Sequence, residues 1–125
     1  MKNKRPVVLA AAACLFMVAG SSSAHHAPSL YDKEHPITLT GTVTEFRFIS
    51  PHAQIHFEVK DENGDVVKWI AHTSPPSKMY RRGWTRNILK PGDQVTVTGG
   101  PDREGRKNMR ILKLSGPRGL EYTEV

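Results

Sequence analysis

Cysteine is nearly absent from this chain. Among its 125 residues Cys14 is the only cysteine, and it lies in an apolar run near the N-terminus. Without that run the protein has no thiol, which excludes disulfides and thiolate chemistry. A domain of about 100 residues without disulfides must be stabilised by its core alone. The chain also has no internal repeat and no low-complexity segment, so we expect one domain.

The usual sequence signals of catalysis are absent as well. There is no nucleophile elbow, no phosphate-binding loop and no close pair of carboxylates. Ser50, Ser74 and Ser77 have no paired base that the sequence reveals. We therefore expect a protein that is not an enzyme, with a bound metal as the one route to catalysis that the sequence leaves open.

Residues 1–24 have the organisation of a secretory signal peptide. A short segment with three basic residues is followed by an apolar run over residues 7–20 and by the small-residue cleavage site Ser22-Ser23-Ala24. The run is too short to span a membrane. We expect cleavage after Ala24 and a periplasmic or secreted protein whose mature chain, starting at His25, has no transmembrane helix. Lipidation of Cys14 is the alternative, and it fits poorly because the apolar run continues beyond the cysteine.

The charge of the chain is only mildly basic once the signal is set aside. Half of the formal net charge of +6 comes from Lys2, Lys4 and Arg5. No long run of like charge remains, and an exported protein meets little nucleic acid. We therefore expect no nucleic-acid partner.

Alternation of apolar and polar side chains predicts β-strands through most of the mature chain. The stretch 50–59 shows it most clearly, because one face is apolar and the other carries His52, Gln54, His56 and Glu58. A turn over residues 61–65 predicts a hairpin with the next strand. In the register that puts all the apolar residues on one face, the opposed pairs are Ile55 and Ala71, Phe57 and Trp69, and Val59 and Val67.

Three further strands are expected over residues 37–48, 94–99 and 109–114. In the first, the apolar phase changes face near Gly41, which indicates a bulge or strong coiling. Residues 74–83 break the alternation and predict a short helix, with Ser74 as its N-cap and Gly83 at its end. Trp84 is expected to pack beneath the barrel.

This order of elements predicts an all-β fold: an OB-like five-stranded partly open barrel with one short helix between strands 3 and 4. A small β-sandwich is the alternative. The barrel is expected over residues 37–114, preceded by an N-terminal arm over residues 25–36 and followed by a flexible tail over residues 115–125.

Several local patterns occur together along the chain: Ala24-His25-His26, Gly41-Thr42-Val43, Phe46, Pro51-His52, Trp69, Ser74-Pro75, Gly83-Trp84 and Leu89-Lys90-Pro91-Gly92-Asp93-Gln94-Val95. In this order and spacing they resemble a family of small exported bacterial proteins known as a domain of unknown function, family 6152. The resemblance covers roughly residues 25–114 and implies export and a small β domain, with no settled activity. This chain has Ser50 where members commonly have Asn, and His72 where they have an acid.

Three histidines on one face of the predicted hairpin are candidate metal ligands. His52 and His56 lie about 13 Å apart along a strand and cannot share a metal by themselves. His72 is expected opposite Gln54, diagonal to both and within reach of either. The same residues would also suit the solvated outer face of a barrel, and the sequence leaves both interpretations open.

The new N-terminus is a second candidate. Cleavage before His25 makes its α-amine and imidazole a chelating pair, with His26 beside it. Amine and imidazole nitrogens suit Cu(II), which makes copper the candidate cofactor. The alternative is a solvated tail. A single site would form if the arm folded back toward His52 and His72.

Two other groups are candidates for partner binding. A basic group surrounds the predicted helix and would suit anionic groups of a partner or a membrane surface, or simply a solvated face; it comprises Lys78, Arg81, Arg82, Arg86 and Lys90. Trp69, Phe57 and Phe48 would suit either a stacking platform or the core.

We therefore expect an exported small binding module, with copper bound through histidines as the leading hypothesis. The alternative is an envelope protein- or glycan-interaction domain that uses the basic helix or the barrel groove.

Overall fold

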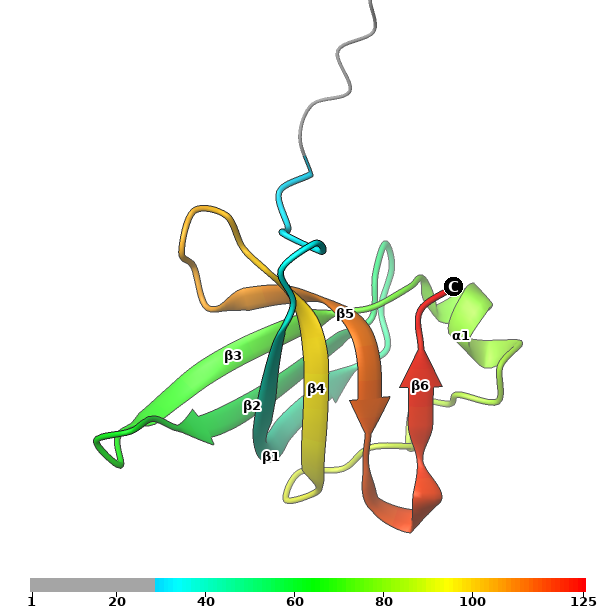
Figure 1. Cartoon of the computed structure of the whole chain (residues 1–125). Coiled ribbons are helices and arrows are strands. Elements are labelled where there is room, and N and C mark those ends of the chain that lie inside the picture. The colour runs from blue at the N-terminus through cyan, green and yellow to red at the C-terminus, as the bar shows by residue number, and fades with distance from the viewer. Residues whose placement is uncertain (1–28) are drawn as a thin grey trace, which may run out of the picture.

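The computed structural model describes residues 29–125, and all structural statements below concern that part of the chain (Figure 1). No helix within it is long and apolar enough to cross a membrane. In chain order its elements are β1 (Ile37–Arg47), β2 (Gln54–Lys60), β3 (Val66–His72), α1 (Pro76–Tyr80), β4 (Gln94–Pro101), β5 (Asn108–Ser115), the 3-10 helix η1 (Pro117–Gly119) and β6 (Glu121–Thr123).

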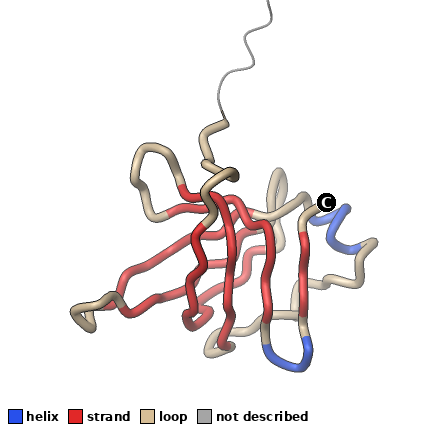
Figure 2. The backbone as a smooth tube through the Cα atoms, viewed as in Figure 1, coloured by secondary structure: helices blue, strands red, loops and turns tan. Residues whose placement is uncertain are grey.

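The strands form one sheet that closes on itself (Figure 2). Its order is β3-β2-β1-β4-β5-β6, and a short parallel pairing between β3 and β5 joins the two sides of the sheet. Five strands thus make a barrel, with α1 between β3 and β4, as the sequence predicts. The closure excludes the alternative sandwich, which needs two stacked sheets.

The hairpin of β2 and β3 has the expected register. Phe57 lies opposite Trp69, Ile55 opposite Ala71, and Gln54 opposite His72. The side chains of Ile55, Phe57 and Ala71 are buried, while those nearer the turn are partly exposed. The turn itself closes through a hydrogen bond from the Asp61 N–H to the Asp65 carbonyl. Alternation alone therefore predicted which face of this hairpin meets the core.

The irregularity in β1 lies a few residues from its expected place. The register with β2 shifts between Val43 and Glu45, so the bulge is not at Gly41. Gly41 is needed for a different reason: a Cβ there would lie 2.3 Å from the Glu58 carbonyl oxygen. The glycine permits the close approach of β1 to β2 that strong coiling requires.

The base of the barrel is closed by an aromatic cluster. Trp84 is 3% exposed, as expected for a residue beneath the barrel. Its ring meets those of Phe46 and Tyr122 edge to face, with centroids 5.9 and 5.4 Å apart. Phe48 extends the cluster by packing against Phe46. These contacts join β1, the loop after α1 and the C-terminal strand into one core.

The prediction of a flexible C-terminal tail is wrong. Residues 117–119 form η1, and β6 then pairs antiparallel with β5. Tyr122 is 2% exposed, and its pairing partner Leu114 is fully buried. A single buried aromatic in an otherwise polar segment gives too short a pattern to be read as a strand from sequence.

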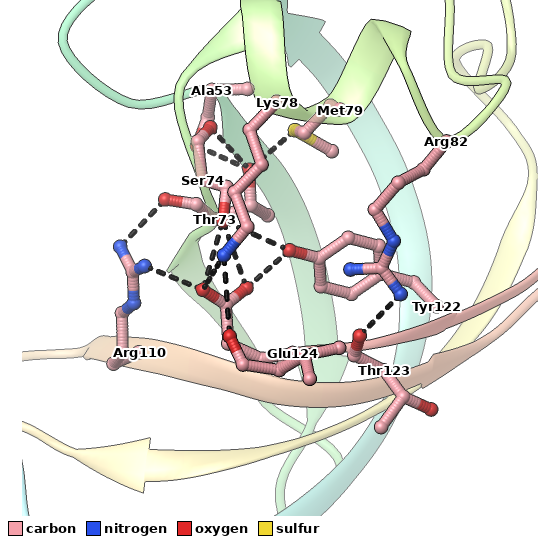
Figure 3. A network of polar contacts seen from close by, with 11 residues as sticks. Ala53, Thr73, Ser74, Lys78, Met79, Arg82, Arg110, Tyr122, Thr123 and Glu124 are labelled. Carbon is pink, nitrogen blue, oxygen red and sulfur yellow. Dashed lines mark hydrogen bonds and ion pairs between the residues drawn. The ribbon is translucent and has the colours of Figure 1, made fainter.

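A polar network fastens this sixth strand to the barrel (Figure 3). The Glu124 carboxylate accepts hydrogen bonds from the hydroxyls of Ser74 and Tyr122, and it pairs with Arg110 at 3.0 Å and with Lys78 at 3.7 Å. Ser74 therefore does not cap α1: the N-cap position is held by Pro75, with no side-chain hydrogen bond. Ser74 lies one residue before that position, and its hydroxyl donates to Glu124 in a charge-assisted hydrogen bond.

The ordered tail can be tested with a matched pair of tyrosines. Tyr122→Ala removes a buried ring and should lower the free energy of unfolding by about 3–5 kcal/mol. Tyr80→Ala, at a tyrosine that is 68% exposed, should change it by less than about 0.5 kcal/mol. Urea unfolding followed by tryptophan fluorescence measures both, and equal midpoints for the two variants would show that the tail contributes nothing.

The network also predicts a pH dependence of stability. Burial raises the pKa of Glu124, but hydrogen bonds from Tyr122 and Ser74 and the charges of Arg110 and Lys78 outweigh it, so the net pKa is lowered. A lowered folded-state pKa stabilises the protein above the unfolded pKa, and that stability is lost as the pH falls through the folded value. Glu124→Gln should therefore cost about 1–3 kcal/mol at pH 7 and should flatten the loss of stability between about pH 5 and pH 3.

Glu121→Gln is the control for this pH profile. Glu121 lies on the same strand, is exposed and takes no part in the network. Glu121→Gln should therefore lose stability at acid pH as the wild type does. The assignment to Glu124 is wrong if urea unfolding at a series of pH values shows the same loss of unfolding free energy for both variants.

Candidate functional site

An open hollow of about 360 Å³ lies where β3 meets β5. The residues that line it come from five parts of the chain: Tyr31, Pro51, His52, Gln54, His72 and Arg110. His52 stands in the loop between β1 and β2, His72 ends β3, and Arg110 lies opposite His72 in the parallel pairing with β5. The barrel closure thus gathers two imidazoles, a guanidinium and a phenol at one place.

Two of the three hairpin histidines meet there and the third does not. His72 lies opposite Gln54, as the hairpin register predicts, and shares the hollow with His52. The ring of His56 turns to the Gln54 side chain instead, with Nε2 3.0 Å from Oε1. Within residues 29–125 no group of three or more histidine and carboxylate side chains is placed to hold a metal ion.

Burial lowers the pKa of His72 below its usual value, and the charges of His52 and Arg110 lower it further, while a hydrogen bond with Asn108 opposes the shift. At neutral pH its imidazole is therefore neutral, the form that coordinates metals. Burial also lowers the pKa of His56.

The Arg110 guanidinium is bonded to other groups of the protein. Its guanidinium donates to the Thr73 carbonyl at 2.6 Å and pairs with Glu124. The carboxylate that fastens β6 thereby offsets the positive charge at the back of the hollow, and less of that charge is left to repel a cation.

The described part of the N-terminal arm is fixed to the barrel. Tyr31 forms a β-bridge with Asp102, the Asp32 N–H donates to the Pro101 carbonyl, and the Arg103 side chain pairs with Asp32 at 3.5 Å. The Tyr31 ring then lies 6.0 Å from that of His72. The arm therefore brings the chain to the rim of the hollow, a contact that sequence reasoning missed because no local pattern encodes it.

Gly100 makes this crossing possible. A Cβ on Gly100 would lie 2.8 Å from the backbone of Asp32 and Lys33. Real Cβ atoms do not approach backbone so closely, so the arm can cross β4 only where the strand has a glycine.

The other predicted site residues have separate places. His25 and His26 lie outside the described residues. Lys78 and Arg82 are engaged with the C-terminal strand, since Lys78 pairs with Glu124 and Arg82 donates to the Thr123 carbonyl at 2.6 Å. Arg81, Arg86 and Lys90 are exposed. The basic group is thus divided between a structural role and the surface.

The three aromatic residues considered for a stacking platform do not form one. Phe57 is 1% exposed inside the barrel. Phe48 belongs to the aromatic cluster around Phe46, and Trp69 lies under the Lys107 ammonium, 5.3 Å from its ring centroid. Their strand periodicity reflects core packing.

These features define a single OB-type barrel domain with a histidine-lined hollow on its outer side. The chain belongs to a family of unknown function, DUF6152, whose model matches residues 12–110. It matches no curated protein.

Two solved structures are similar in fold. The mitochondrial single-stranded DNA-binding protein Rim1 of S. cerevisiae is 8% identical, with a TM-score of 0.51 over 69% of this chain and 96% of that one. A small single-stranded DNA-binding protein from Streptomyces coelicolor is 16% identical, with a TM-score of 0.49 over 69% of this chain and 95% of that one. The likeness to Rim1 confirms the OB-like barrel, and at such low identity it concerns the fold alone.

The attachment of the N-terminal arm to β4 can be tested at Gly100. Gly100→Ala should push the arm off β4, so the Asp32 amide should lose its hydrogen-exchange protection. The Val43 amide, bonded to the Asp93 carbonyl at the other end of the β1–β4 pair, is the internal control and should stay protected. Protection of the Asp32 amide in the variant would show that the arm does not depend on this crossing.

Proposed function

We propose that this protein is an exported binding domain, not an enzyme, and that its ligand is Cu(II). The site is the hollow of His52 and His72, completed by the α-amine and imidazole of His25 after removal of the signal peptide. The main observation behind the proposal is the attachment of the N-terminal arm to the barrel. It brings Tyr31 to the hollow that His52 and His72 share.

The reach of the arm supports this assembly. His25 lies four positions before Ser29, where the described chain begins. An extended segment of that length spans about 13 Å. His26 lies one residue further along and is an alternative donor from the same segment.

The donor set suits copper better than other common ions. It offers two imidazoles from the barrel and an amine–imidazole chelate from the arm, all nitrogen and none thiolate. An all-nitrogen set of this kind would favour Cu(II) over the earlier first-row ions and over Mg²⁺ or Ca²⁺. His56 has no part in it, because its ring is held by Gln54.

Copper affinity should depend on each barrel histidine. His52→Ala and His72→Ala should each weaken Cu(II) binding by at least about tenfold, the lower end of what loss of even an outer-shell partner causes. Affinity should also fall as the pH is lowered from about 8, because the protonated α-amine, with an ordinary pKa of about 7.7–8.0, and protonated imidazole do not coordinate. Isothermal titration of protein recovered from the periplasm, with His25 as its first residue by intact mass, provides the measurement.

Two variants serve as controls. His35→Ala should bind as the wild type does, since His35 is exposed and pairs with Asp32 outside the hollow. His56→Ala should also bind normally. The proposal is wrong if His52→Ala and His72→Ala leave the affinity unchanged, and the arm has no part in it if an added N-terminal methionine has no effect.

A further inference from the structure

A second hollow, of about 390 Å³, lies between the loop that follows α1 and the turn around η1. It shares no lining residue with the histidine hollow. One wall carries Arg82, Trp84 and Ile88, and the other carries Arg118 and Leu120. Two guanidinium groups therefore stand over apolar side chains at one concave place.

Both guanidinium groups are held in position by the protein. That of Arg82 lies over the Tyr122 ring, 4.7 Å from the centroid, and donates to the Thr123 carbonyl. That of Arg118 donates through one nitrogen to the Ile88 carbonyl at 3.1 Å and to Asp93 at 3.2 Å. A guanidinium has five N–H donors, so each retains donors for a ligand. Their positions are set before any ligand arrives, which lowers the entropy cost of binding.

The backbone of Arg118 gives an independent indication. Its φ of 58° and ψ of 30° place it in the left-handed region, and it is the one non-glycine residue with positive φ in residues 29–125. A long side chain is disfavoured there, and glycine, as at the next position, would fit without strain. An arginine at a strained position beside a hollow points to a use for its side chain.

The charge around the hollow favours an anionic ligand. The segment 81–90 supplies one wall through Arg82, Gly83, Trp84 and Ile88. It includes four basic residues, of which Arg82 lines the hollow, and no acidic one. Arg118 is partly neutralised by Asp93, and Glu121 is among the residues that line the hollow. A dense polyanion would bring several charges close to these two carboxylates and meet more repulsion than a single carboxylate that lies between the two guanidinium groups.

The aromatic residue at the hollow does not suit a sugar. Trp84 is 3% exposed, and its ring is packed against Phe46 and Tyr122, so no free face remains for stacking. The apolar contribution comes from Ile88 and Leu120, both partly exposed aliphatic side chains. They suit an aliphatic side chain next to a carboxylate.

We propose that this hollow binds an acidic segment of a partner protein, in which a carboxylate lies between Arg82 and Arg118 and a neighbouring aliphatic side chain packs on Ile88 and Leu120. Planar, bidentate contacts with carboxylate are what arginine forms best. The site is independent of the histidine hollow, so copper should neither be required nor compete.

A pair of synthetic peptides tests this proposal. The probe is a capped hexapeptide of alternating Glu and Leu, and its matched control has Gln in place of Glu. In an NMR titration of the mature protein, the Glu peptide should shift the Trp84 indole N–H signal and the Gln peptide should not. Inorganic phosphate and a uronic acid oligosaccharide are titrated in two further experiments. Binding of either at this place as tightly as the Glu peptide would overturn the choice of ligand.

Three variants locate the site. Arg118→Gly should raise the Kd for the Glu peptide at least tenfold while the protein still folds, because glycine relieves the backbone. Arg118→Lys keeps the charge but not the planar fork, so it should recover only a small part of the affinity. Arg47→Ala removes an exposed charge elsewhere, on β1, and should have no effect. Equal weakening by Arg47→Ala and Arg118→Gly would show non-specific charge attraction, and wild-type affinity in Arg118→Gly and Arg118→Lys would exclude the site.

Discussion

The parallel contact between β3 and β5 is the feature on which most of this structure depends. It joins only three residue pairs, yet it turns an open sheet into a barrel. It places Ala71 beside Met109, both fully buried, and so seals the core. The next residue pair of the same contact is His72 and Arg110, which lie at the surface. This pairing forms part of the lining of the histidine hollow. The same contact therefore closes the core and forms the candidate site.

The two ends of the chain complete what the barrel begins. At one end the arm crosses β4 at Gly100 and carries Tyr31 to His72. At the other end β6 adds to β5, and Glu124 joins Ser74 and Arg110 beneath α1 (Figure 3). Arg110 belongs to both regions, because its guanidinium is held by Glu124 while it lines the hollow. Changes in the C-terminal strand are thus expected to reach the histidine site through this residue.

The two proposed surfaces use opposite electrostatic arrangements. In the histidine hollow the positive charge of Arg110 is paired inside the protein, which leaves the imidazole nitrogens available to a cation. In the hollow beside η1 the guanidinium groups of Arg82 and Arg118 are held at the surface, where their remaining donors suit an anion. A small domain without thiols or an aromatic platform can in this way offer two chemically distinct sites on one barrel.

The sequence by itself determined the local pattern of the fold. Period-two alternation set which faces of β2 and β3 are buried, and the common apolar face selected their register, so His72 could be placed opposite Gln54. It did not reveal that His52, rather than His56, shares a hollow with His72, because alternation puts both on one face; in the structure His52 stands in the loop before β2 and the His56 ring turns to Gln54. Arg110 and Tyr31 were missed because they reach the hollow through contacts between segments far apart in the sequence. Tertiary structure also decided the partner of Ser74, which lies 50 residues away at Glu124, and the order of the tail. Alternation reports the environment of a residue along its own strand, whereas these contacts depend on which strand edges and polar groups remain unpaired once the barrel has closed.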